Sequence, residues 1–428
     1  MDTIFALSTA EGKSGVAIIR ISGTNAVSAV EKLCGAAPDH RKTSLRVLKG
    51  RDGSRIDEAL ILRFEEGASF TGEKVIEIQC HGSNAVVSRL LDELAAVDGF
   101  RLAEPGEFTR RALENGRLDI AQVEGLSDLI DAETDAQRLQ ANRVLSGELG
   151  QKVQVWRKNL IKAAALLEAT IDFADEEVPE DVRPEVKGLI DFVLSDLDME
   201  IEGVAAAERV RSGFEVAIIG APNVGKSTLF NRLAKREAAI TSEHAGTTRD
   251  VIEVRMDLDG LPVTMLDTAG LRKTTDPVEA IGVDRATSRA KRADLRVVLL
   301  MPHEVSPIEL DEDDIVLAAK SDLRKNVDRG ISGLTGAGIT DLIRDITKTL
   351  KKRAAIAGIA THSRHRNAMQ KGQESLFAAK AAIEISGFST ELAAEDLRSA
   401  IRSLDSLVGR IDVENLLDEI FSNFCIGK

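Results

Sequence analysis

The segment that most constrains the fold of this chain is a glycine-rich turn at residues 220–227, Gly-Ala-Pro-Asn-Val-Gly-Lys-Ser. It follows the apolar run 215–219 and precedes the run 228–234, which has the composition of a helix. A strand, the pattern GxxxxGKS and a helix in this order form a phosphate-binding loop, or P-loop. The segment therefore predicts a parallel α/β domain that binds a nucleotide. The alternative, an ordinary glycine-rich turn, does not account for the flanking strand and helix.

The P-loop supplies the chemical groups that a nucleotide phosphate needs. Its backbone N–H groups face the β-phosphate, and the N-terminus of the following helix adds positive potential. The lysine neutralises β- and γ-phosphate oxygens, and the serine hydroxyl is a ligand for Mg²⁺. We expect nucleotide contacts from six consecutive residues: Asn223, Val224, Gly225, Lys226, Ser227 and Thr228.

Two further segments complete the predicted phosphate and Mg²⁺ site. The run 261–266 reads as a strand and ends at Asp267-Thr-Ala-Gly270. In this DxxG pattern, Asp267 faces a metal-bound water and the Gly270 N–H faces the γ-phosphate. The segment 246–250, Gly-Thr-Thr-Arg-Asp, lies between the P-loop and DxxG, and Thr248 is the expected second hydroxyl for Mg²⁺. An ordinary polar loop is the alternative for 246–250.

Specificity for guanine is predicted from the segment 316–322, Val-Leu-Ala-Ala-Lys-Ser-Asp. GTPases carry Asn-Lys-x-Asp here, and the aspartate accepts hydrogen bonds from guanine N1 and N2. This chain keeps Lys320 and Asp322 but has Ala319 at the asparagine position, and Ser332-Gly-Leu334 is the candidate for the next base-contacting loop. The pattern favours GTP with weakened affinity. The alternative is a surface lysine beside a helix-capping aspartate.

The residue after Gly270 raises a question about hydrolysis. Ras-like GTPases use a glutamine there to orient the attacking water, and this chain has Leu271. Either hydrolysis is slow or another group acts. The nearby candidates are Arg272, Asp276, Glu279 and Asp284, together with an arginine from a partner protein.

Patterning along the chain predicts a multidomain α/β and α fold. Residues 1–118 alternate short apolar runs with turns, with strands expected at 16–21, 59–64 and 75–79 and a helix at 84–96. Helical periodicity dominates on both sides of an α/β segment. The expected domains are an N-terminal α+β domain at 1–118, a discontinuous all-helical domain at 119–210 and 353–428, and an inserted Ras-like P-loop domain at 211–352.

Composition argues against several classes of protein. The net charge of the 428 residues is −14, and residues 119–210 carry 9 basic against 21 acidic side chains. A protein that coats nucleic acid would be basic, and one that stacks single-stranded bases would exceed the 3% aromatic residues found here. Three isolated cysteines fit a reducing cytosol, and no signal peptide or long apolar run is visible. We expect a cytoplasmic protein without membrane contact.

Several segments together resemble the MnmE (TrmE) family of tRNA-modification GTPases. Besides 246–250 and 267–272, the more selective ones are Ser-Phe-Thr-Gly-Glu-Lys-Val-Ile-Glu at 69–77, Glu-Pro-Gly-Glu-Phe-Thr-Arg-Arg-Ala at 104–112 and Cys-Ile-Gly-Lys at 425–428. The resemblance covers effectively the whole chain. It implies a homodimer joined through N-terminal domains that bind 5-formyl- or methylene-tetrahydrofolate. The matching folate contacts are Arg20, Glu77, Arg117 and Lys428; without the resemblance, Arg20 and Arg117 would read as surface charges.

The resemblance also implies that the GTPase domains dimerise on nucleotide and bind K⁺. The matching K⁺ ligands are Asn223, Ser242, His244 and Thr247, of which Ser242 and Thr247 also contact the nucleotide. A cation there can compensate charge on the β- and γ-phosphates, as an arginine finger does. Glu279 matches the family glutamate that positions the attacking water, which offers an answer to the Leu271 question. An exposed acidic residue at a helix start is the alternative for Glu279.

The function implied by the resemblance is modification of the wobble uridine of certain tRNAs at C5. The product would carry an aminomethyl or carboxymethylaminomethyl group, the partner would be the FAD protein MnmG, and GTP hydrolysis would time a rearrangement of the complex. A GTP-switched ribosome-assembly or RNA-binding factor is the alternative, but it predicts a basic appendage and neither flank is basic. A dynamin-like membrane GTPase is disfavoured because no basic amphipathic helix is visible.

Overall fold

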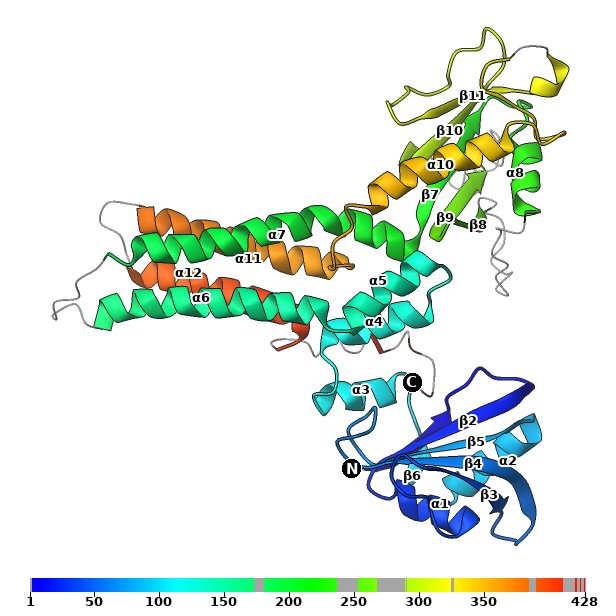
Figure 1. Cartoon of the computed structure of the whole chain (residues 1–428), viewed down its shortest axis with the longest axis vertical. Coiled ribbons are helices and arrows are strands. Elements are labelled where there is room, and N and C mark those ends of the chain that lie inside the picture. The colour runs from blue at the N-terminus through cyan, green and yellow to red at the C-terminus, as the bar shows by residue number, and fades with distance from the viewer. Residues whose placement is uncertain are drawn as a thin grey trace, which may run out of the picture. The chain divides into compact units, whose positions relative to one another are not determined.

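The computed structural model describes residues 2–172, 181–236, 253–267, 289, 291–324, 327–384, 390–410, 420, 421, 424 and 427. The chain forms two compact units (Figure 1). The first contains residues 1–127 and 405–428, and the second contains residues 128–404. In the described part of the chain, no helix is both long and apolar enough to cross a bilayer.

The first unit is built on a six-stranded sheet with the order β3-β4-β5-β2-β1-β6. β1 and β6 are parallel, and the other neighbouring pairs are antiparallel. The strands are β1 (Thr3–Leu7), β2 (Ser14–Ser22), β3 (Thr43–Lys49), β4 (Arg55–Phe64), β5 (Val75–Gly82) and β6 (Phe100–Leu102). The helices are α1 (Ala26–Cys34), α2 (Asn84–Ala95), α3 (Glu107–Glu114) and α4 (Ile120–Ile130), which extends into the second unit.

Alternation along the central strands fixes the two faces of this sheet. Ile19 and Ile21 of β2 and Ile76 and Ile78 of β5 are fully buried in the core that α1 and α2 cover. Because successive side chains of a strand point to opposite faces, the residues between them lie on the other face. The strands expected at 16–21, 59–64 and 75–79 and the helix expected at 84–96 are confirmed.

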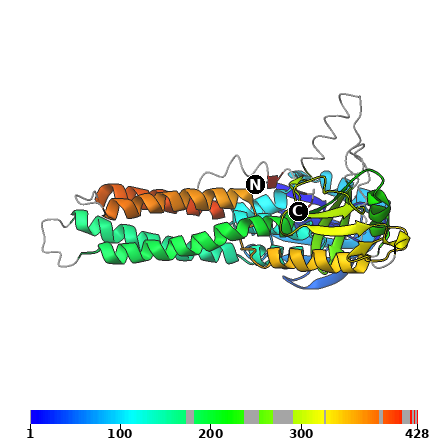
Figure 2. The same cartoon turned by 90° about the horizontal axis from the view of Figure 1, so that it is seen from above.

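Long helices dominate the second unit. They are α5 (Asp135–Leu145), α6 (Glu148–Asp172), α7 (Arg183–Ser212), α11 (Ser363–Glu384) and α12 (Thr390–Asp405). α6, α7, α11 and α12 run side by side in both views (Figures 1 and 2). Trp156 of α6 is fully buried, and its indole N–H donates a 2.7 Å hydrogen bond to Asp196 of α7. Periodicity of apolar residues correctly predicted these long helices.

A second six-stranded sheet belongs to the same unit, with the order β12-β11-β10-β7-β9-β8. Its strands are β7 (Phe214–Gly220), β8 (Glu253–Leu258), β9 (Leu261–Asp267), β10 (Leu295–Leu300), β11 (Ile315–Ala319) and β12 (Gly330–Ile331). All neighbours are parallel except β8 and β9. The helices α8 (Lys226–Ala234) and α10 (Ile339–Ala354) share its core. The predicted multidomain α/β and α fold class is confirmed.

Candidate functional site

The P-loop connects β7 to α8, as the sequence predicts. Gly225 precedes α8 with φ +113°, a conformation that only glycine adopts without strain. Asn223 is also left-handed, with φ +62°. A Cβ atom on Gly220 would lie 2.6 Å from the Leu299 carbonyl oxygen of β10, so the strand end also requires glycine. The loop can turn tightly because Asn223 and Gly225 adopt positive φ angles and Gly220 has no side chain.

Lys226 places a positive charge inside this loop. Its Nζ donates hydrogen bonds of 2.8 Å and 2.9 Å to the carbonyl oxygens of Gly220 and Ala221. Burial lowers the pKa of Lys226, and the carboxylates of Asp267 and Glu304 oppose that change. The lysine that the sequence assigns to phosphate therefore lies within the turn rather than extending into solvent.

Asp267 ends β9 at the same sheet edge as the P-loop. β7 and β9 are parallel neighbours, and Asp267 pairs in register with Ile218, close to the end of β7. The Asp267 side chain is buried. The structure thus brings Asp267 near the P-loop, with Ser227 and Thr228 in the first turn of α8. The other predicted phosphate, cation and water-positioning residues lie outside the described residues: Ser242, His244, Thr247, Thr248, Gly270 and Glu279.

The predicted base-contacting residues follow β11, which is separated from β7 by β10. Lys320 has a left-handed backbone with φ +54°, and Asp322 is exposed in the short 3-10 turn Ser321–Leu323. Ala319 is buried and pairs with Ile331 of β12. A Cβ atom on Gly333 would lie 2.6 Å from the Leu229 backbone nitrogen, so the loop after β12 packs directly on α8. Sequence reasoning identified Gly333 as part of a base loop but not this close approach.

The predicted folate residues Arg20 and Glu77 lie directly opposite each other on β2 and β5. Arg20 Nη2 and Nε lie 2.9 Å and 3.0 Å from Glu77 Oε1. The Arg20 guanidinium carbon lies 5.7 Å from the centre of the Phe70 ring and 5.8 Å from that of Phe108. An ion pair therefore sits beside two aromatic rings on the sheet face opposite α1 and α2. Sequence reasoning missed both rings, although both belong to the selective segments.

Arg117 and the C-terminal residues can be placed through their neighbours. A Cβ atom on Gly72 would lie 3.3 Å from Arg117 Cγ, so Arg117 lies against the loop between β4 and β5. The Ser8 hydroxyl donates a 2.9 Å hydrogen bond to the Gly427 carbonyl, beside the end of β1. Lys428 itself lies outside the described residues.

A buried ion-pair network holds the loop that carries Phe70. Arg111 Nη1 lies 3.0 Å from Glu73 Oε2, and Arg111 Nη2 lies 3.1 Å from Glu107 Oε1. The Ser22 hydroxyl donates a 2.7 Å hydrogen bond to the same Glu73 oxygen, Oε2. This network links α3 to the loop and to β2, and it fixes the surroundings of Arg20. The sequence offered one signal for it, the repeated arginine at 110–111.

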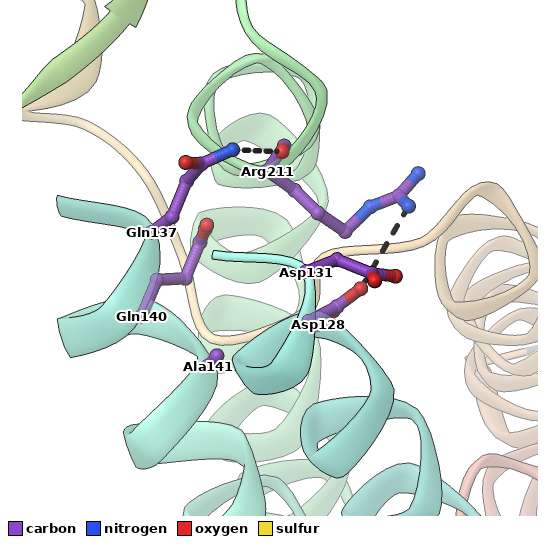
Figure 3. A pocket seen from close by; sticks show the side chains of 6 residues that line it. All are labelled: Asp128, Asp131, Gln137, Gln140, Ala141 and Arg211. Carbon is purple, nitrogen blue, oxygen red and sulfur yellow. Dashed lines mark hydrogen bonds and ion pairs between the residues drawn. The ribbon is translucent and has the colours of Figure 1, made fainter. Parts of the chain in front are cut away.

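A small cavity of about 80 Å³ lies where α4, α5 and α7 meet (Figure 3). The Gln137 amide donates a 2.8 Å hydrogen bond to the Arg211 carbonyl, and the Arg211 guanidinium is directed at Asp128, 3.8 Å away. Arg211 Nε also donates to the Thr361 carbonyl at 3.3 Å. Arg211, at the end of α7 just before β7, thus binds the segment between α10 and α11, where the chain has left the sheet that carries the P-loop.

Comparison with known proteins agrees with this architecture. The family model described as GTP-binding protein TrmE N-terminus matches residues 3–117, and the model described as MnmE helical domain matches residues 120–425. The tRNA modification GTPase MnmE of Roseobacter denitrificans is 60% identical over 428 residues, covering all of both chains. The protein of the same name from Dinoroseobacter shibae is 60% identical over 430 residues, again covering all of both chains. The chain therefore belongs to the MnmE family of tRNA modification GTPases.

Proposed function

We propose that this protein hydrolyses GTP to GDP and phosphate and couples this reaction to modification of tRNA at C5 of the wobble uridine. The observation that carries the proposal is the position of Lys226 in a P-loop beside Asp267, in a chain that belongs to a family of tRNA modification GTPases. The modified base would carry an aminomethyl or carboxymethylaminomethyl group. The FAD protein MnmG would be the partner, and a tetrahydrofolate derivative would donate the carbon unit.

The P-loop residues bind and orient the phosphates in this proposal. Lys226 moves its hydrogen bonds from loop carbonyls to the β- and γ-phosphate oxygens, while backbone N–H groups of residues 223–228 hold the β-phosphate. Ser227 and Thr248 would hold Mg²⁺, with Asp267 facing its water shell. The bound ion neutralises charge that develops on the phosphates. The Gly270 N–H holds the γ-phosphate, and Lys320 and Asp322 select guanine.

Glu279 is the proposed group that positions the attacking water, because Leu271 has no polar atom for that task. Asn223, Ser242, His244 and Thr247 are the proposed K⁺ ligands. K⁺ would compensate phosphate charge when two GTPase domains dimerise.

The N-terminal unit is the proposed folate site. Glu77 is an acceptor for the N–H groups of a pterin, and Arg20, 2.9 Å from it, holds that carboxylate in position. Phe70, which is 36% exposed, supplies apolar surface beside them, as a flat heterocycle requires, while the fully buried Phe108 ring supports Arg20 from within the protein. Arg117 and Lys428 are the further proposed contacts. The donor set therefore fits a 5-formyl- or methylene-tetrahydrofolate.

The assembly state and location of the protein belong to the same proposal. We place folate binding and homodimerisation in residues 1–118, a helical domain in 119–210 and 353–428, and the GTPase domain in 211–352. The negative charge of residues 119–210 repels the phosphate backbone of a nucleic acid. We therefore expect MnmG to supply much of the basic surface that binds tRNA. The protein would act in the cytoplasm.

Nucleoside analysis tests the proposed function directly. tRNA would be isolated from cells that lack this protein, digested, and examined by mass spectrometry for modified wobble uridines. We expect the modification to disappear and to return with the wild-type gene, but not with Lys226→Ala. The exposed Lys235→Ala variant is the matched control and should restore it. Intact wobble modification in the deletion strain would refute the function.

A further inference from the structure

The loop after β12 is closed by hydrogen bonds among its own residues, and two of its backbone carbonyls take no part in those bonds. The Ser332 N–H donates to the Ala337 carbonyl at 3.0 Å, and the Gly336 N–H donates to the Ser332 carbonyl at 2.9 Å. The Ser332 hydroxyl accepts a 3.1 Å hydrogen bond from the Thr335 N–H. These bonds close residues 332–337, which we name the base loop, and they leave the carbonyls of residues 334 and 335 for other partners.

Arg232 of α8 binds both of those carbonyls. Its Nη1 donates to the Leu334 oxygen at 2.7 Å, and its Nη2 donates to the Thr335 oxygen at 3.1 Å. A Cβ atom on Gly336 would lie 2.9 Å from Arg232 Nη2, so the loop approaches the guanidinium closely. Two donors in one rigid plane fix both the position and the tilt of the loop, which a single ammonium group cannot do.

The same helix carries Lys226 in its first turn, so Arg232 connects the base loop to the phosphate site through one rigid element. The connection through Arg232 is important because residue 319 is an alanine. Its methyl group has no hydrogen-bonding atom, so residue 319 of β11 cannot tie the base-contacting segment to the rest of the site through its side chain. Arg232 instead fixes the base loop from α8, through its hydrogen bonds to the carbonyls of Leu334 and Thr335.

We propose that Arg232 is a positioning residue for guanine recognition. It holds the base loop against α8, so that the backbone N–H groups of Gly333 and Leu334, which take no part in the hydrogen bonds that close the loop, donate to the guanine carbonyl oxygen O6. The amino group at the same place in adenine is itself a donor and cannot accept those bonds. The inference rests on the proposed binding of GTP, and it adds a residue that sets the preference for guanine over adenine.

Equilibrium binding of fluorescent GDP and ADP to the full chain tests this role. Arg232→Ala should weaken GDP binding about tenfold, the scale for loss of a charged hydrogen-bond pair at an exposed site. ADP binding should not change, so the preference for GDP falls by the same factor. Arg232→Lys should lie between the two. Arg236→Ala removes the same charge just beyond α8 and should match the wild type. The kcat at saturating GTP should stay constant while KM rises.

Three results would overturn the proposal: unchanged GDP binding by Arg232→Ala, equal losses for GDP and ADP, or an equal effect of Arg236→Ala. A wild-type protein that binds GDP no better than ADP would instead refute the proposed use of GTP. Arg232 is exposed, and its removal leaves the core intact. Should Arg232→Ala still unfold, the Arg232→Lys variant gives the same comparison of GDP with ADP.

Discussion

Gly203 of α7 lies directly against Gly358, so that a Cβ atom on Gly203 would stand 2.5 Å from the Gly358 backbone nitrogen. The Gly358 N–H donates a 3.3 Å hydrogen bond to the Gly203 carbonyl. Next to it, the Ile359 N–H donates a 3.0 Å hydrogen bond to the buried Glu200 carboxylate. Two backbones in contact here hold the segment that leads from α10 to α11 against α7.

Replacement of Gly203 by alanine should therefore be costly. The new methyl group meets backbone atoms that cannot move aside, so we expect a loss of about 3 kcal/mol in the free energy of unfolding. Gly188→Ala in the same helix is the control. A Cβ atom there meets no atom within 4 Å, and alanine should stabilise the helix by about 0.5–1 kcal/mol. Chemical denaturation measures both, and equal effects of the two changes would contradict the contact.

Lys226→Ala should remove nucleotide binding while leaving the fold intact. The variant loses the ammonium that the P-loop holds through the carbonyls of Gly220 and Ala221. Loss of charged hydrogen bonds to two phosphates should weaken GTP binding about 100-fold or more. Titration calorimetry with GTP checks this, and circular dichroism checks the fold. A variant that binds GTP as the wild type does would exclude Lys226 from the site.

Arg20→Ala should weaken binding of 5-formyl-tetrahydrofolate about tenfold to 100-fold, because Glu77 loses the ion-pair partner that holds its carboxylate in position for the pterin. Arg55→Ala is the control, since Arg55 forms an exposed ion pair with Glu58. Titration of each variant with the folate measures the change. Unchanged affinity in Arg20→Ala would place the folate elsewhere.

How far the sequence predicts this structure depends on the distance over which each feature is encoded. The P-loop follows from a short run, because β7, the turn and α8 are consecutive and glycine is required where the backbone demands it. Strands such as β3 and β8 were not predicted, because they lie at sheet edges and their half-exposed residues lack a strong apolar pattern.

Features that join distant segments could not be predicted from the residues alone. Arg20 faces Glu77 because β2 pairs with β5 in one register, and no local pattern fixes that register. Arg232 and the carbonyls of Leu334 and Thr335 meet only because α8 and the end of β12 pack together. The family resemblance supplied Arg20 and Glu77, but neither it nor any spacing indicated Arg232.

Glu279→Ala should leave GTP binding unchanged and lower kcat about 100-fold, because a positioned group that orients or polarises water contributes on this scale. The accompanying K⁺ proposal predicts faster hydrolysis in K⁺ than in Na⁺ for the wild type. Phosphate release at saturating GTP measures both. An unchanged kcat in Glu279→Ala would remove that role, and equal wild-type rates in the two salts would remove the K⁺ site.

Glu107 gives the N-terminal unit a predictable dependence on pH. Burial raises the pKa of its carboxyl group, but hydrogen bonds from Arg101, from the Glu104 N–H and from Arg111 outweigh burial and hold the pKa below its usual 4.5. The folded chain therefore binds this proton less tightly than the unfolded chain does. The resulting stabilisation is complete above pH 4.5 and is lost as the pH falls through the lowered folded value.

Glu107→Gln should consequently lower the free energy of unfolding by about 2 kcal/mol at pH 7, because it leaves the buried Arg111 with one carboxylate fewer. The difference from the wild type should shrink at acidic pH, where the wild-type carboxylate also becomes neutral. Glu114→Gln, at an exposed position of the same helix, should change stability little at either pH. Denaturant titrations at both pH values provide the measurement. A difference that is equally large in acid would mean that Glu107 stabilises the fold through packing and not through its charge.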